Sequence, residues 1–60
     1  MSKFEIFKGQ DDKYYFHLKA ENGQIVAASQ GYTQKAHAQE GIESIKRIAA
    51  DADVEDLTGK

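Results

Sequence analysis

The dipeptide Asn22-Gly23 constrains the fold of this chain more than any other feature of its sequence. Asparagine followed by glycine favours a two-residue type I′ turn, because both central residues of that turn need positive φ. The segment before it, residues 14–20, carries apolar residues at every second position, which is typical of a strand with one buried face. Residues 24–29 form the returning strand. The sequence therefore predicts a β-hairpin over residues 14–29.

A further strand is predicted over residues 3–8, joined to the hairpin by a polar loop at residues 9–13. This loop length places Phe4 opposite Leu18 and Ile6 opposite Phe16. The Asn22-Gly23 turn in the same way places Ala20 opposite Ile25. A slip of one residue would turn the apolar side chains to the other face, so the register is well specified. The predicted core face of the sheet consists of Phe4, Ile6, Phe16, Leu18, Ala20, Ile25 and Ala27.

An amphipathic helix is predicted over residues 34–50, with the Thr33 hydroxyl as its N-cap. Gly41 lies on the apolar side of this helix, which indicates a close approach between helix and sheet. The apolar stripe of the helix consists of Ala38, Gly41, Ile42, Ile45, Ile48, Ala49 and Ala52. Three antiparallel strands and one helix make a single α+β domain over residues 1–60.

A chain of 60 residues without cysteine has few ways to stabilise itself. A domain of this size buries only about 60% of the surface that its unfolded chain exposes. The absence of cysteine excludes disulfides, thiolate metal sites and a cysteine nucleophile. Of the usual remedies for a small core, association with a second copy remains. No apolar run reaches membrane-spanning length and no secretory signal is recognised, so a cytoplasmic protein without a membrane partner is expected.

The outer face of the predicted sheet is only partly polar. The register places Phe7 beside Tyr15, Glu5 beside His17, and Lys19 between Lys3 and Val26. Two aromatic side chains and a valine on an uncovered face form a small apolar patch, which favours a subunit contact or a ligand surface. The candidate interface residues are Phe7, Tyr15, His17, Lys19 and Val26 on this face, with Val54 and Leu57 in the C-terminal tail.

Six segments of the chain together resemble the YegP-like family of uncharacterised bacterial and archaeal proteins. These segments are Lys3–Lys8, Tyr14–Ala20, Asn22–Ala27, Ser29–Thr33, Gly41–Lys46 and Val54–Thr58. The resemblance covers nearly the whole chain and implies a β-β-β-α-β unit.

The resemblance also implies a homodimer in which two units share a single sheet and exchange their C-terminal strands. The exchanged strand would be residues 54–58. From its residues alone, the acidic tail from Asp51 to Lys60 is predicted to be mostly disordered, with Val54 and Leu57 as its only anchors. The family has no established catalytic residues, so none is carried over, and His17 is assigned no family role.

Two patterns on the outer face raise the question of chemistry. His17 and Glu5 could exchange a proton, but a solvated cross-strand polar pair is the simpler interpretation. Lysines interleaved with aromatic residues can bind single-stranded nucleic acid, yet only Lys3 and Lys19 are available and the net charge is −2.

Metal binding is not expected, because His17 and His37 lie on different elements without a further ligand. No catalytic, cofactor or metal residue is predicted. We expect a homodimeric structural or interaction module without enzymatic activity. Nucleic-acid binding is the alternative, and an enzyme with a site at the dimer junction ranks last.

Overall fold

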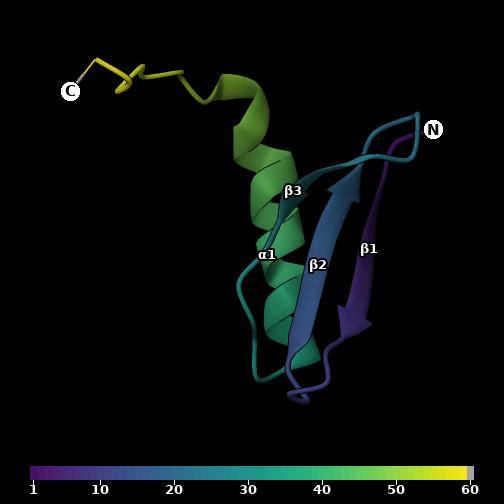
Figure 1. Ribbon diagram of the computed structural model, residues 1–60. Coiled ribbons are helices and arrows are strands. Elements are labelled where there is room, and N and C mark those ends of the chain that lie inside the picture. Colours follow the sequence, from purple (N-terminus) through teal and green to yellow (C-terminus); the bar gives the residue numbers. More distant parts are fainter. Residues whose placement is uncertain (60) are drawn as a thin grey trace.

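The computed structural model describes residues 1–59. It contains strands β1 (Lys3–Lys8), β2 (Tyr14–Lys19) and β3 (Ile25–Ala28), helix α1 (Lys35–Ile48) and a short 3₁₀ helix, η1 (Ala49–Asp51). The strands form one antiparallel sheet in the order β1-β2-β3, and α1 lies across one face of it (Figure 1). The predicted α+β fold with three antiparallel strands and one helix is confirmed.

Strands β1 and β2 pair in the predicted register. Phe4 lies opposite Leu18, and Ile6 lies opposite Phe16. These four apolar residues turn to the face that α1 covers, because side chains two residues apart in a strand point the same way. The alternation of apolar and polar residues is thus sufficient to orient this part of the sheet.

The loops of the two hairpins have the same backbone geometry. In the first, the Gly9 nitrogen donates to the Lys13 carbonyl at 2.8 Å and the Asp12 nitrogen donates to the Gly9 carbonyl at 3.0 Å. In the second, the Ala20 nitrogen donates to the Gln24 carbonyl at 2.8 Å and the Gly23 nitrogen donates to the Ala20 carbonyl at 3.0 Å. Each loop therefore has three residues, and the third has positive φ.

The predicted type I′ turn at Asn22-Gly23 is therefore wrong. Within residues 1–59, only Asp12 (φ 65°) and Gly23 (φ 87°) have positive φ, and Asn22 does not. The chain forms the three-residue alternative, in which one left-handed residue follows an ordinary turn. The Asn22 Oδ1 accepts a hydrogen bond from the Gln24 nitrogen at 3.0 Å, which holds the loop closed.

The changed loop shifts the start of β3. Leu18 lies opposite Ala27 as predicted, but Ile25 lies opposite Lys19 instead of Ala20, with an irregularity between Leu18 and Lys19. Such a bulge inserts one extra residue and re-aims the side chains beside it. Ile25 is 56% exposed, so its predicted place in the core is wrong. Ala27 is exposed as well.

The helix begins one residue later than predicted and packs through a small contact area. Gln34 occupies the N-cap position without a side-chain hydrogen bond, so the predicted Thr33 cap is wrong. Ala38 and Ile42 are buried. A Cβ placed on Gly41 would lie 2.9 Å from the Tyr32 hydroxyl oxygen, which confirms the close approach predicted there.

The core of the described chain consists of three buried side chains, Phe16, Ala38 and Ile42. Phe16 packs edge-on against Phe4 and stacks on Tyr32. Tyr32 is held at the end of the sheet by two backbone hydrogen bonds with Tyr14, at 2.7 and 2.8 Å. The core is thus centred on β2 and the first half of α1.

The second half of the helix and the tail contribute little to this core. Ile48 at the end of α1 is 57% exposed. Beyond η1 the backbone is irregular and leads away from the sheet and helix (Figure 1). No strand forms over residues 54–58 in the single chain. Because that strand is expected to pair with a second copy, it stays a prediction.

Candidate functional site

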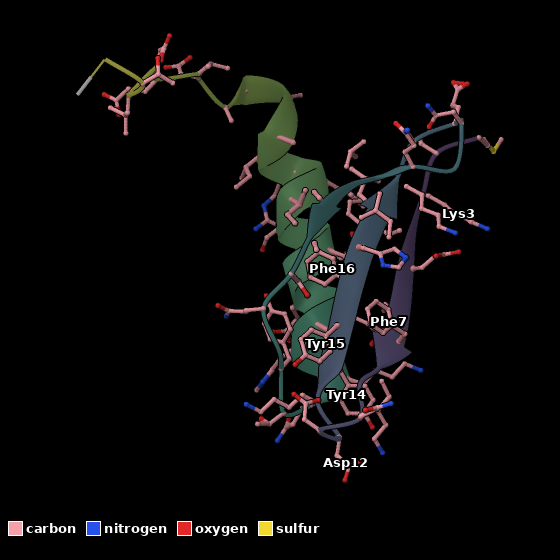
Figure 2. The ribbon with its side chains drawn as sticks, viewed as in Figure 1. Lys3, Phe7, Asp12, Tyr14, Tyr15 and Phe16 are labelled. Atoms are coloured by element: carbon pink, nitrogen blue, oxygen red, sulfur yellow. The ribbon has the colours of Figure 1, made fainter. Side chains whose placement is uncertain are left out.

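The outer face of the sheet gathers side chains from alternate positions of β1 and β2. The pairing places Lys3 opposite Lys19, Glu5 opposite His17, and Phe7 opposite Tyr15. Among the residues labelled in Figure 2, Phe7 and Tyr15 lie toward one end of the sheet and Lys3 toward the other. The face therefore has an aromatic end, a charged middle and a basic end, in the order that the sequence predicts.

The aromatic end is a row of three rings. Phe7 and Tyr15 are stacked with 5.8 Å between ring centroids, and the His17 ring lies 5.0 Å from Phe7. Phe7 is 44% exposed, which is high for a phenylalanine in a strand. The row thus offers apolar surface beside polar groups on a face that no helix covers.

A hydrogen bond ties the row to the first hairpin loop. The Tyr15 hydroxyl donates to Asp11 Oδ2 at 2.6 Å, and the Lys13 nitrogen donates to Asp11 Oδ1 at 3.1 Å. These bonds stabilise the ionised carboxylate and lower the pKa of Asp11. The same carboxylate raises the pKa of Tyr15. Tyr15 is therefore held as a neutral donor whose orientation is set by the loop.

Glu5 is the centre of the charged middle. Its Oε1 lies 2.6 Å from His17 Nε2 and 3.4 Å from Lys19 Nζ, and its Oε2 lies 3.4 Å from Lys3 Nζ. The hydrogen bond with His17, followed by the charge of Lys19, lowers the pKa of Glu5 from 4.5 to about 2. A carboxylate accepts hydrogen bonds only, so Nε2 carries the proton between them.

This arrangement makes proton transfer through Glu5 unfavourable. A general base works best when its pKa lies near the operating pH, whereas the pKa of Glu5 lies far below neutrality. The pair is better explained as a cross-strand contact that joins β1 to β2. The facing of Glu5 and His17 is confirmed.

The structure does not bring the two histidines together. His17 lies in β2 and His37 lies exposed in the first turn of α1. Within residues 1–59, no group of three or more histidine, aspartate or glutamate side chains is placed to hold a metal ion. No helix in that range is both long and apolar enough to span a membrane.

Exposed aliphatic side chains elsewhere on the chain are further candidates for an interface. Val54 and Leu57 in the tail are 95% and 57% exposed, and Val26 is 60% exposed. Ile25 and Ile48 are exposed to a similar degree, although sequence reasoning assigned both to the core. No sequence pattern indicates that either residue is exposed. The exposure of Ile25 follows from the bulge in β3, and the exposure of Ile48 follows from its place at the end of the helix, beyond the part that the sheet covers.

The predicted interface residues thus fall into separate groups. Phe7, Tyr15, His17 and Lys19 share the outer sheet face. Val26 lies on the edge strand β3, but the bulge places Ile25 opposite Lys19, so the predicted position of Val26 beside Lys19 is wrong. Val54 and Leu57 lie apart from the others in the tail. Their roles in an interface stay a prediction.

Comparison with known proteins finds uncharacterised relatives. Residues 10–56 match the model of a domain of unknown function, DUF1508. A UPF0339 protein of Agrobacterium fabrum is 50% identical over 97% of this chain and 94% of its own length. The UPF0339 protein YegP of Yersinia pestis is 41% identical over 77% of this chain, but over only 41% of its own length.

A solved structure has the same fold. The solution structure of a protein from Haloferax volcanii has a TM-score of 0.85 and 46% sequence identity, covering 93% of this chain and 95% of that one. Similarity at this level extends from the arrangement of the elements to much of the sequence.

Proposed function

The chain belongs to the DUF1508 family, whose UPF0339 relatives include YegP, and we propose that it acts as a homodimeric interaction module without catalytic activity. A domain of unknown function carries no activity over to this chain, so the proposal rests on the surfaces of the molecule. The absence of cysteine is compatible with a reducing compartment, and the cytoplasm is the proposed location.

The observation that carries the proposal is the mismatch between a very small core and a set of exposed aliphatic side chains. Only Phe16, Ala38 and Ile42 are buried apolar residues within residues 1–59. Ile48 and Val54, both suited to a core, are more than half exposed. Burying a side chain of this size stabilises a protein by about 1.5–3 kcal/mol, which a second copy would supply.

The free edge of β3 is the surface that we propose the partner covers. Helix α1 packs against β1 and β2 but not against β3. Every residue of β3 is exposed, and its outer edge has no neighbouring strand in the part of the chain that the structure describes. An uncovered edge strand of this kind is a template for pairing with another chain.

The tail is the proposed occupant of that edge. Val54 and Leu57 of one copy would cover Ile25 and Ile48 of the other, and the backbone of residues 54–58 would add a strand beside β3. Exchange of an identical segment between two copies closes the assembly as a symmetric dimer. The length of one relative supports this, since the match covers 77% of this chain but only 41% of YegP, which leaves room there for a second such unit.

Light scattering on the purified chain at micromolar concentration tests the proposal. We expect a dimer mass, a monomer mass after deletion of residues 53–60, and a lower melting temperature in the deletion variant. The double variant Val54→Asp, Leu57→Asp should act like the deletion. Glu55→Gln is the matched control in the same tail and should stay dimeric. A compact, stably folded monomer of the intact chain would refute the proposal.

A second candidate function is binding of single-stranded nucleic acid on the outer sheet face. The exposed Phe7 in its row of rings, with Lys3 and Lys19 on the same face, is the observation that favours it. It ranks second because both lysines already pair with Glu5. A gel shift at low salt with single- and double-stranded oligonucleotides tests it, and Phe7→Ala should abolish any shift. No shift at low salt would refute it.

A further inference from the structure

The tip of the second hairpin carries a reactive pair of residues. Asn22 is the only asparagine of the chain, and it precedes Gly23 in an exposed loop. We propose that Asn22-Gly23 is a self-modification site, at which the folded hairpin holds back conversion of the asparagine side chain into a succinimide. The reaction needs water as its only co-reactant and no enzyme.

The chemistry uses the backbone of the loop itself. The Gly23 nitrogen attacks the Asn22 side-chain carbonyl carbon, so that a new N–C bond closes a five-membered ring. The bond from that carbon to the side-chain nitrogen breaks, and ammonia leaves with the proton of the attacking nitrogen. Water then opens the ring at either carbonyl and yields aspartate or isoaspartate. Glycine favours the attack because it has no Cβ to shield its nitrogen.

The fold engages both reacting groups in hydrogen bonds. The Gly23 nitrogen donates to the Ala20 carbonyl at 3.0 Å. The Asn22 Oδ1 accepts from the Gln24 nitrogen at 3.0 Å. Attack requires the Gly23 nitrogen to leave the Ala20 carbonyl, and it requires the Asn22 side chain, held in place by the Gln24 nitrogen, to turn its carbonyl carbon toward the Gly23 nitrogen. The reaction therefore proceeds from the fraction of molecules in which this loop is open. Open fractions of hairpin loops are set by the local free energy of opening.

The two products have different effects on the hairpin. Aspartate keeps an oxygen in place for the Gln24 nitrogen and leaves the main chain unchanged. Isoaspartate routes the main chain through the former side chain and adds one carbon between Asn22 and Gly23. The added backbone atom changes the geometry of the three-residue loop, and the loop that sets the register of β3 is lost. Either product adds one negative charge to the net charge of −2.

The test compares the folded and unfolded intact chain at one mildly alkaline pH. One sample is kept native and the other in urea, with circular dichroism confirming each state, and conversion at residue 22 is followed by peptide mapping. We expect conversion to be at least about tenfold faster in urea, which corresponds to a loop-opening free energy of about 1.4 kcal/mol or more. Isoaspartate should accumulate in the unfolded sample.

Two variants serve as controls. Asn22→Asp should release no ammonia at this position in either sample and should keep the fold. Gly23→Ala in urea should react more slowly than the parent chain in urea, because the added Cβ shields the nitrogen. Equal rates in native and unfolded parent chain would overturn the protective role of the hairpin. If neither the native nor the unfolded parent chain reacts at residue 22, Asn22-Gly23 is not a modification site.

Discussion

Asp12→Gly should stabilise the protein, because Asp12 occupies a position that favours glycine. Asp12 has φ 65°, and it takes the place in the first hairpin loop that Gly23, with φ 87°, takes in the second. Side chains of L-amino acids crowd the backbone in this left-handed region, and only glycine enters it without that cost. The two loops of one molecule thus provide a direct comparison.

The magnitude follows from three contributions. The left-handed conformation costs an ordinary residue about 1–2 kcal/mol, and aspartate lies near the low end because it tolerates this region. Glycine loses more backbone freedom on folding than aspartate does, and this lowers the gain in stability by about 0.5 kcal/mol. The contact between Lys8 Nζ and Asp12 Oδ1 is 4.0 Å long and exposed, so its loss changes stability little. The expected net gain is about 0.5–1 kcal/mol.

Urea denaturation at fixed protein concentration measures the change. The midpoint should rise for Asp12→Gly with an unchanged slope, and the melting temperature should rise by about 2–8 °C for a chain of this length. Concentration is held constant because a dimer would make the midpoint depend on it.

The reciprocal variant provides the control. Gly23→Asp should lower stability by a similar amount, since a Cβ on Gly23 meets no atom within 4 Å and only the backbone conformation is penalised. Asp12→Asn removes the charge and keeps a residue that tolerates the left-handed region, so it should be nearly neutral. A destabilised Asp12→Gly together with an unaffected Gly23→Asp would refute the reasoning.

Three further outcomes are expected. Phe16→Ala removes the largest buried side chain and should cost about 3–5 kcal/mol in urea denaturation; a loss below 1 kcal/mol would mean that the core lies elsewhere. The pKa of Glu5 falls from 4.5 unfolded to about 2 folded, so the ionised form stabilises the fold above about pH 4.5 and this contribution disappears as the pH falls toward 2. The stability difference between the parent chain and Glu5→Gln should therefore shrink over that range, and a difference independent of pH would contradict the ion cluster. Tyr15→Phe should raise the pKa of Asp11 toward its ordinary value in an NMR titration, and an unchanged pKa would show that the hydroxyl does not set it.

The outer sheet face could be predicted from the sequence, because it depends on two local rules. Alternation determines which side chains share a face, and loop length determines which of them lie opposite each other. Phe7 beside Tyr15 and Glu5 beside His17 follow directly. The cluster in which Lys3, Lys19 and the His17 ring converge on the Glu5 carboxylate was not predicted, because side-chain rotamers on a pleated face are chosen by all neighbours together.

Turn type, helix start and burial could not be predicted in the same way. Asn22-Gly23 is compatible with a two-residue turn and with the last two positions of a three-residue loop. The difference moves Ile25 from the core face to the solvent. Thr33 is a good N-cap by residue type, yet the helix begins after Gln34.

The sequence by itself determined the order of the elements, the face that each strand turns inward and the pairing of β1 with β2, because these follow from the spacing of neighbouring side chains. Only the tertiary structure decided which apolar residues are buried. Helix α1 reaches β1 and β2 but not β3, and no further helix or sheet within residues 1–59 covers the rest. Burial depends on how much surface the whole fold can enclose, a quantity that no local pattern contains.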